Sequence, residues 1–263
     1  MDLHFHKYHG TGNDFILVDG RFASQHMSTR QIARLCDRHF GIGADGLIIL
    51  DEAKGYDFRM TYYNSDGNES TMCGNGGRCI VAFADFLSLI ENEAHFLAID
   101  GAHEARILAR GLDSYHISLR MNDVASIVKW NEDIVTNTGS PHLVRFVDSL
   151  EIEDIKAMAR PLRYHVDFAP VGINVNFVME LPDGIRMRTY ERGVEDETLS
   201  CGTGATASAL AYAFKKKITS GIIPVQSPGG DLQVKFKALP GGGYTDIWLE
   251  GPAVRVFEGK VEL

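Results

Sequence analysis

Two of the four cysteines stand in the same short motif, Cys-Gly-x-Gly. The motifs are Cys73-Gly74-Asn75-Gly76 and Cys201-Gly202-Thr203-Gly204, and the second cysteine follows the first by 128 residues (201 − 73), about half of the 263-residue chain. Glycines let the backbone approach a ligand closely, and the apolar residues after each motif recur at helical spacing. Each motif therefore predicts a turn that opens a helix, with a thiol beside the first turn.

Such a turn suits one kind of chemistry. The N–H groups of a first helical turn have no partner within the helix and bind anions such as a carboxylate, and the same end of the helix dipole stabilises a thiolate. When one thiolate removes a proton from a carbon next to a carboxylate, a thiol on the opposite face can deliver one. We therefore interpret Cys73 and Cys201 as an acid and base pair, titrating as a coupled unit, that inverts such a carbon.

The surroundings of the two motifs also repeat, which indicates an internal duplication. The matching segments, in register, are Gly10–Asn13 with Thr138–Pro141, Phe58–Asn64 with Ile185–Glu191, the two motifs themselves, and Asp100-Gly101 with Gly229-Gly230. We predict two similar lobes with a break near Asn122–Ser126, so that residues 1–121 carry Cys73 and residues 122–251 carry Cys201. A C-terminal strand, about 252–263, is expected to pack back onto the first lobe.

Each lobe has the pattern of a mixed α/β structure in which strands dominate. Short β-favouring runs predict strands at 15–18, 47–50, 58–63, 116–121, 143–147, 174–179, 185–190, 232–236 and 246–249. A capping box at Ser28 predicts a helix that ends near Gly41. Helical spacing also occurs over 79–90, 207–214 and 152–158, and Pro161 is expected to stop the last of these helices.

Composition excludes several classes of function. The chain has 26 basic and 35 acidic residues, a net charge of −9, without the clustered Lys and Arg of nucleic-acid-binding proteins. It has no apolar run of the roughly 18 residues that would predict a membrane helix, and its N-terminal residues lack the apolar core of a signal peptide. We therefore expect a cytoplasmic protein whose partner is a small molecule, with no nucleic acid and no membrane.

The other two cysteines are interpreted as structural. Cys36 lies on an apolar helix face, and Cys79 has Ala207 at the matching place of the second lobe. Both are predicted to be inert core residues, as most single cysteines are. No Cys-x-x-C pair indicates a zinc ribbon.

The sequence also indicates neither a metal nor a cofactor. His4, His6 and His9 are explained by alternation on a strand better than by metal binding, because no acidic or cysteine partner has a suitable spacing. No lysine stands in a motif that would suggest a Schiff base with pyridoxal phosphate.

The motifs together resemble the diaminopimelate epimerase family, in family order across nearly the whole chain. The resemblance is carried by His9–Phe15, Arg38–Gly46, Asn64–Asn68, Cys73–Cys79, Gly139–His142, Tyr190–Gly193, Cys201–Gly204 and Ser227–Gly230. It implies an α+β fold of two pseudo-symmetric lobes, each a β-sheet or barrel wrapped round a central helix. It also implies a pyridoxal-independent, homodimeric isomerase that converts LL-2,6-diaminoheptanedioate to the meso form in lysine and peptidoglycan-precursor synthesis.

By the same resemblance, Cys73 and Cys201 would be the catalytic pair, with His142 and Glu191 orienting the amino end near the reacting carbon. Backbone N–H groups of the two Cys-Gly-x-Gly turns would hold the reacting carboxylate. The implied substrate-binding residues are Asn13, Asn64, Gly74, Asn75, Ser140, Asn174, Glu191, Arg192, Gly202 and Thr203. Arg192 can pair bidentately with the distal carboxylate, and Glu191 can accept hydrogen bonds from an ammonium group.

Two positions depart from the family pattern. Ser140 stands where the family often has Asn, and a hydroxyl is shorter and offers one donor instead of two. Gly46 stands where the family often has Gln, so that side-chain contact is missing. Both changes concern substrate recognition and leave the thiols intact.

Three other functions are compatible with parts of the pattern. A proline racemase or hydroxyproline epimerase would use two thiols on a cyclic imino acid, without need of Arg192 for a distal carboxylate. A non-enzymatic amino-acid-binding protein would need the carboxylate-binding turns but not the thiols, so Cys73→Ala would still function. A redox sensor would use Cys73 and Cys201 as a thiol pair.

Overall fold

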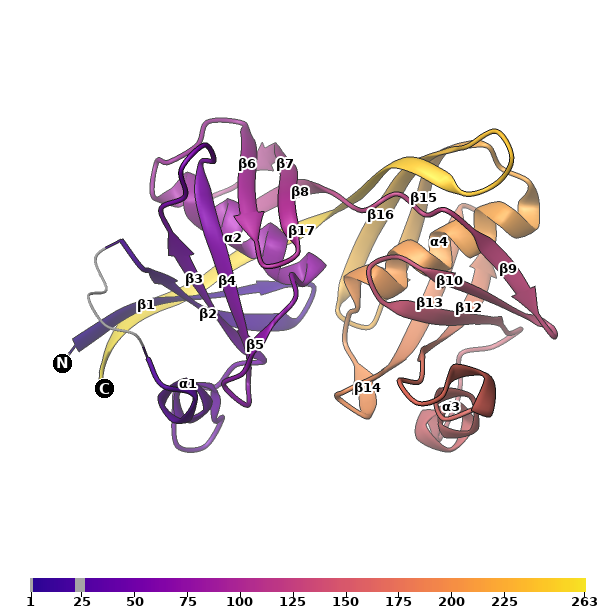
Figure 1. The fold of residues 1–263 in the computed structure, drawn as a ribbon, viewed down its shortest axis with the longest axis horizontal. Coiled ribbons are helices and arrows are strands. Elements are labelled where there is room, and N and C mark those ends of the chain that lie inside the picture. Colours follow the sequence, from indigo (N-terminus) through magenta and orange to yellow (C-terminus); the bar gives the residue numbers. More distant parts are fainter. Residues whose placement is uncertain (1, 22–26) are drawn as a thin grey trace. The chain divides into compact units, whose positions relative to one another are not determined.

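The structure, a computed structural model, describes residues 2–21 and 27–263 (Figure 1). It contains two compact units. The N-terminal lobe consists of Met1–Leu119 with Gly251–Leu263, and the C-terminal lobe consists of Arg120–Glu250. No described helix has both the length and the apolar character needed to cross a membrane.

The N-terminal lobe is a closed barrel of strands. Its strands are β1 (Asp2–Gly10), β2 (Asn13–Asp19), β3 (Gly46–Asp51), β4 (Phe58–Asn64), β5 (Glu69–Ser70), β6 (Glu93–Ala98), β7 (Gly101–Arg110), β8 (Ser114–Arg120) and the C-terminal part of β17 (Tyr244–Glu262). The pairing runs β17–β1–β2–β3–β4–β6–β7–β8 and returns to β17. Closure leaves no open sheet edge in this ring.

The helix α2 (Gly74–Phe86) fills this barrel (Figure 1). Its residues 74–84 are all buried, as expected for a helix that packs on every side. Two glycines after Cys73 allow the close approach: an added Cβ on Gly76 would lie 3.0 Å from Ile48, and one on Gly77 would lie 2.9 Å from Leu119. The turn after the cysteine is therefore pressed against the barrel wall.

The C-terminal lobe repeats this plan. Its strands are β9 (Ile127–Trp130), β10 (Asp133–Asn137), β11 (Pro141–Phe146), β12 (Asn174–Leu181), β13 (Gly184–Glu191), β14 (Asp196–Thr198), β15 (Ser220–Ser227), β16 (Gly230–Ala238) and the N-terminal part of β17. They pair in the order β9–β10–β11–β12–β13–β15–β16–β17, and a bridge between Val124 and Tyr244 continues the ring. The buried helix here is α4 (Gly202–Lys216).

Parallel pairs occur at equivalent places in the two lobes. They are β2 with β3 and β4 with β6 in one lobe, and β11 with β12 and β13 with β15 in the other. A parallel pair needs a crossover connection, and these connections contain α1 (Thr29–Cys36), α2, α3 (Ile155–Arg163) and α4. The prediction of two pseudo-symmetric α+β lobes, each a barrel round a central helix, is confirmed.

Helix ends differ from the sequence prediction in three places. The capping box at Ser28 is present, but α1 ends at Cys36, because Asp37 is extended and its carboxylate accepts the N–H groups of His39 and Phe40 instead. The helix α2 ends at Phe86, four residues before the predicted end at Ile90 (90 − 86). The prediction that Pro161 stops α3 is wrong.

The helix α3 begins at Ile155, where Asp154 caps it, and continues past Pro161 to Arg163. A proline inside a helix removes one backbone hydrogen bond. The last turn is nevertheless held, because the Arg163 guanidinium donates to Glu195 at 2.7 Å and to the Val171 carbonyl at 3.1 Å. Tertiary contacts of Arg163, two residues after the proline, thus offset what the backbone loses.

Candidate active site

Each of the two motif cysteines is the N-cap residue of the buried helix in its lobe. Cys73 precedes α2 and Cys201 precedes α4, both in extended backbone conformation. Their carbonyl oxygens accept the first helical hydrogen bonds, from Gly77 at 2.7 Å and from Ala205 at 2.8 Å. Neither cysteine side chain caps its helix, so each sulfur lies beside a first turn whose N–H groups have no partner within the helix.

The Cys73 sulfur contacts an amide oxygen. Its S–H donates to Asn13 Oδ1 at 3.6 Å, and the same oxygen accepts a hydrogen bond from Asn75 Nδ2 at 3.1 Å. The Asn13 amide is oriented from its other end, where Nδ2 donates to the Asp45 carboxylate at 2.7 Å. Because a carbonyl oxygen only accepts, this arrangement favours the protonated thiol.

Behind Asn75 lies Arg78, which is completely buried. Its guanidinium donates to Asn75 Oδ1 at 2.9 Å and to the carbonyl of Gly74 at 3.3 Å, within the first turn of α2. Burial lowers the pKa of Arg78 to about 10, so the group stays protonated at neutral pH. Arg78 thereby fixes the amide of Asn75, whose other end holds Asn13.

The Asp45 carboxylate belongs to a charged network at the start of β2 and β3. Arg38 pairs with Asp14 at 2.6 Å and with Asp45 at 2.8 Å, and Lys7 pairs with Asp14 at 2.7 Å. Burial opposes ionisation of Asp14, but hydrogen bonds from Arg38 and Lys7 outweigh it and hold the pKa of Asp14 below its ordinary value. The network anchors the backbone that carries Asn13.

Asn64 lies at the exposed end of β4, in a turn that its N–H closes by donating to the Asn68 carbonyl at 3.0 Å. Among the described residues, no hydrogen bond joins it to the Cys73 cluster. Its strand partner is Gly46. A Cβ added to Gly46 would lie 2.5 Å from the Tyr63 carbonyl and 2.6 Å from the Tyr62 ring, so this chain has no room for the family's longer side chain there.

The Cys201 sulfur contacts a hydroxyl group rather than an amide oxygen. Thr203 Oγ1 lies 3.5 Å from Cys201 Sγ and 2.9 Å from His142 Nε2. A second polar contact holds the same residue, because Thr138 donates its hydroxyl to the Thr203 carbonyl at 2.8 Å. A Cβ on Gly204 would lie 2.7 Å from Asn176 Oδ1, so the turn requires glycine at this position.

The hydrogen-bond pattern assigns the tautomer of His142. Asn176 Nδ2 donates to the Leu143 carbonyl at 3.0 Å, which fixes the amide, and it also donates to His142 Nδ1 at 3.1 Å. The proton of the neutral ring is then on Nε2 and is donated to Thr203 Oγ1. The Thr203 hydroxyl hydrogen is left to point at Cys201.

His142 has no exposed surface, and burial, with a smaller effect of Arg192, lowers its pKa to about 3. By the family resemblance, His142 belongs to the catalytic groups and orients the amino end of the substrate near the reacting carbon, and that role stays a prediction. In the structure His142 lies buried behind Thr203 and is linked to the Cys201 sulfur through the threonine hydroxyl. A completely buried, neutral imidazole is suited to positioning Thr203 and not to exchanging protons with a ligand.

Three predicted ligand-binding residues form one cluster at the start of β12. Asn174 Nδ2 donates to Ser140 Oγ at 2.9 Å, and Asn174 Oδ1 accepts from the backbone N–H of Arg192 at 2.8 Å. The Arg192 guanidinium donates to Ser140 Oγ at 3.4 Å. Asn174 is 3% exposed, so it holds the other two residues in place, whereas Ser140 and Arg192 are half-buried and accessible.

Glu191 and Arg192 open a turn that is anchored from behind. Glu191 Oε2 accepts from the Thr198 hydroxyl at 3.0 Å. Glu195, in the same turn, accepts from the Gly193 N–H at 3.0 Å and from Arg163 at 2.7 Å. Burial opposes ionisation of Glu195, but these hydrogen bonds hold its pKa well below the usual range. The turn is thus tied to α3.

Sequence reasoning missed four residues that build these sites: Asp45, Arg78, Asn176 and Glu195. Arg78 and Asp45 lie within the quoted motifs, so a search for charged residues inside those motifs would have found them. Asn176 carries no such signal, because it looks like any polar residue of a strand.

The other two cysteines behave as predicted: Cys36 and Cys79 are buried, and burial raises the pKa of Cys36 to about 11 and that of Cys79 further.

The fold of two duplicated barrels with buried helices is shared with solved structures of several proteins. A phenazine biosynthesis protein of the PhzF family from Bacillus anthracis superimposes with a TM-score of 0.77 at 16% identity, covering 100% of both chains. A hydroxyproline epimerase from Agrobacterium vitis superimposes with a TM-score of 0.71 at 15% identity, covering 100% of this chain and 93% of the other. These likenesses define the architecture as that of a two-lobed fold found in epimerases.

Comparison of the sequence identifies one family among the proteins with this two-lobed fold. The sequence model described as diaminopimelate epimerase matches residues 5–112 and 134–254. A diaminopimelate epimerase from Flavobacterium psychrophilum is 49% identical over 98% of this chain and 100% of its own length, and one from Chlorobaculum tepidum is 38% identical over 97% and 99%. The chain therefore belongs to the diaminopimelate epimerase family, which confirms the resemblance seen in the sequence, and it is an amino-acid epimerase.

Proposed function

We propose that this protein epimerises LL-2,6-diaminoheptanedioate to meso-diaminoheptanedioate with Cys73 and Cys201 as the proton-transferring groups, without a cofactor. The reaction belongs to lysine and peptidoglycan-precursor synthesis. The observation that carries the proposal is the matched placement of the two thiols. Each is the N-cap of a largely buried helix at equivalent positions of a duplicated fold, in a chain 49% identical to a diaminopimelate epimerase.

The reacting carboxylate binds at the first turns of α2 and α4. The backbone N–H groups of Gly74, Asn75, Gly202 and Thr203 are the donors, and the positive ends of both helix dipoles add to the attraction. The same positive ends stabilise the carbanion-like charge that develops as the α-proton leaves. One sulfur takes the proton from one face of the carbon, and the other sulfur delivers a proton to the opposite face.

The distal amino acid end binds through groups that the C-terminal lobe holds rigidly. Arg192 is the partner of the distal carboxylate, because its backbone N–H is fixed by Asn174 and its guanidinium reaches Ser140 Oγ at 3.4 Å. Ser140 Oγ already accepts from two donors, which leaves its own hydrogen for the ligand. Glu191 receives an ammonium group, and Asn13 and Asn64 are further ligands from the N-terminal lobe.

The contacts of the two sulfurs assign a resting protonation state. Cys73 donates its S–H to an amide oxygen, whereas the Thr203 hydroxyl is directed by His142 to donate to Cys201. The buried Arg78 charge, which donates to the Asn75 side chain and the Gly74 carbonyl, attracts a Cys73 thiolate and so opposes this inequality, and the direct contacts of the two sulfurs outweigh it. We therefore assign the thiol to Cys73 and the thiolate to Cys201 before substrate binds.

Proton NMR in deuterated buffer with reductant tests the proposal. The purified protein, with no pyridoxal phosphate added, is incubated with LL-2,6-diaminoheptanedioate beside Cys73→Ala and Cys36→Ala as the matched control. We expect the wild type and Cys36→Ala to exchange the α-proton for deuterium and form the meso isomer, and Cys73→Ala to form no meso isomer. No exchange by the wild type would overturn the substrate assignment, and formation of the meso isomer by Cys73→Ala would overturn the mechanism.

A further inference from the structure

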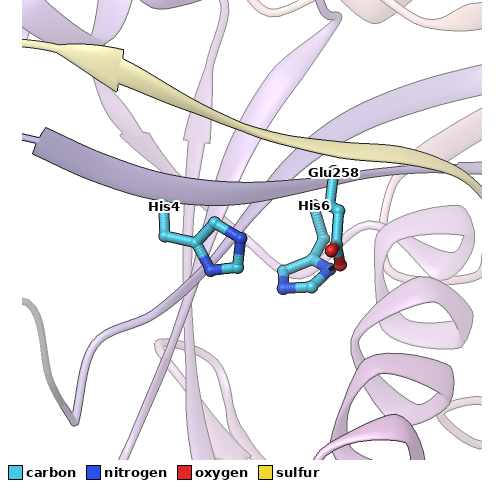
Figure 2. Close-up of side chains that lie close together, drawn as sticks. All are labelled: His4, His6 and Glu258. Atoms are coloured by element: carbon cyan, nitrogen blue, oxygen red, sulfur yellow. Dashed lines mark ion pairs between the residues drawn. The ribbon is translucent and has the colours of Figure 1, made fainter.

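A group of metal-ligating side chains lies outside the candidate active site, on β1 and β17 of the N-terminal lobe. Figure 2 shows His4 and His6 side by side, with the Glu258 carboxylate next to the His6 ring. One nitrogen of each imidazole and one oxygen of Glu258 all lie within 4.8 Å of one another. His4 and His6 share a face because they are two residues apart on a strand, and Glu258 is the strand partner of His6.

The nitrogen of His6 that faces Glu258 lacks an ordinary partner. His6 Nδ1 is buried and makes no hydrogen bond, yet it lies 3.3 Å from Glu258 Oε2. The ring is held in this orientation because it packs against Phe83 at 5.0 Å and Phe86 at 5.2 Å between ring centroids. The buried Nδ1 therefore stays beside the Glu258 carboxylate.

We propose that His4, His6 and Glu258 bind a divalent transition-metal ion of the zinc type. In a tetrahedral zinc site with bonds of about 2.0–2.1 Å, neighbouring ligand atoms lie about 3.3 Å apart. His6 Nδ1 and Glu258 Oε2 already have a separation of 3.3 Å. His4 is exposed, so its ring can rotate the remaining distance, and water completes the coordination.

The chemistry of the three ligands selects the ion. Two imidazoles and one carboxylate suit zinc, nickel or cobalt, whereas magnesium and calcium prefer oxygen ligands only.

Two cationic residues near the three ligands oppose metal binding, and the ligands must outweigh them. Arg255 approaches Glu258 at 3.4 Å, but its shorter bond of 2.9 Å is to Asp113. Lys260, the strand partner of His4, is exposed and its charge is screened by solvent.

The ion would join the two ends of the chain. The strands β1 and β17 are adjacent in the barrel of the N-terminal lobe, and Glu258 follows His4 by 254 residues (258 − 4). A metal that binds the folded protein and not the unfolded chain stabilises the fold. The role assigned to this site is therefore to hold the closing strand pair of the barrel, separate from the thiol chemistry.

Cobalt titration tests this proposal in untagged Cys73→Ala/Cys201→Ala protein, which lacks the two motif thiols that would also bind metals. We expect one Co²⁺ per chain, with visible d–d absorption and without a sulfur-to-metal charge-transfer band. In this background, His4→Ala and Glu258→Gln should each weaken binding by about tenfold or more. The control His95→Ala removes an exposed histidine of the same lobe and should bind as tightly as the parent.

Zinc provides an independent readout in the same set of variants. Zn²⁺ should raise the thermal midpoint of the parent and of His95→Ala, and leave that of His4→Ala unchanged. His4 is exposed, so its removal is compatible with folding and keeps the comparison interpretable. Absence of cobalt binding in the parent, or equal binding and equal zinc stabilisation in His4→Ala, would overturn the proposed site.

Discussion

The turns at Cys73 and Cys201 have the same backbone but different polar surroundings. Strand register equates Phe15 with His142, since they pair with the first residues of β3 and β12, Gly46 and Asn174. Beside Gly76, an added Cβ would meet the hydrocarbon of Ile48 and Phe15, whereas beside Gly204 it would meet the Asn176 amide. The two lobes thus share the helix, the turn and the thiol, but the wall beside the turn is apolar in one lobe and hydrogen-bonded in the other.

The different polar surroundings determine which hydrogen-bonding group contacts each sulfur. In the N-terminal lobe the polar support comes from the helix, through Arg78 and Asn75, and from Asp45, and it ends in an acceptor, Asn13 Oδ1. In the C-terminal lobe it comes from the barrel wall, through Asn176 and His142, and it ends in a donor, the Thr203 hydroxyl. The proposed two-base mechanism needs one thiol and one thiolate at the same time, and we propose that these unequal surroundings supply that inequality before substrate binds.

The largest expected effect is loss of either thiol. Cys73→Ala and Cys201→Ala should each lower the epimerisation rate by about 10³-fold or more, because each removes one of two proton-transfer groups that typically contribute roughly 10²–10⁴-fold apiece. The rate of meso formation measures this, with Cys36→Ala as the control. Epimerisation at the wild-type rate by either variant would show that the two turns are not a catalytic pair.

Thr203→Val tests the polar contact of the Cys201 sulfur in the C-terminal lobe. It removes the donor to Cys201 and leaves the buried Nε2–H of His142 without an acceptor, which costs roughly 1–3 kcal/mol. We expect about a 10²-fold loss of kcat and a higher pH midpoint for alkylation of Cys201, followed by mass spectrometry. Thr203→Ser should restore both. The control Thr206→Val removes a hydroxyl that donates to the Gly202 carbonyl one turn further on and should leave the midpoint in place.

Asn13→Ala tests the N-terminal side, and its expected sign is opposite. The variant removes the acceptor of the Cys73 S–H, so the pH midpoint for alkylation of Cys73 should fall while that of Cys201 stays constant. A midpoint is compared instead of a rate because the maximal alkylation rate also depends on how well the reagent reaches the sulfur. We expect about a tenfold loss of kcat, since Asn75 also loses a hydrogen bond of roughly 1 kcal/mol. A rise of the Cys73 midpoint would contradict the assignment of the thiol to Cys73.

The features that the two lobes share could be predicted from the sequence, and the features that differ between them could not. The shared parts, two helices opened by Cys-Gly-x-Gly and a repeated strand order, depend on local spacing and are visible in the printed residues. The side chains that support the two thiols differ between the lobes and are not visible in the sequence. Asn13 is held by Asp45, and Asn176 reaches Cys201 through His142 and Thr203. These partners meet only after the barrels close. Glu258 beside His6 is the extreme case, because a partner at the other end of the chain has no spacing that a motif could record.

The smallest expected effect concerns stability rather than rate. Burial lowers the pKa of His142 from 6.5 to about 3, so the unfolded chain binds a proton that the folded protein rejects. The contribution of neutral His142 to the free energy of unfolding is fully present above pH 6.5. It is lost as the pH falls from 6.5 towards 3, with a slope of at most about 1.4 kcal/mol per pH unit. His142→Gln, which does not titrate, should therefore lose less stability than the wild type between pH 7 and pH 5. Urea unfolding at both pH values measures the difference. Because no group equivalent to His142 titrates at Phe15 in the N-terminal lobe, Phe15→Leu should keep the wild-type pH dependence, and an equal change in both variants would remove His142 as the cause.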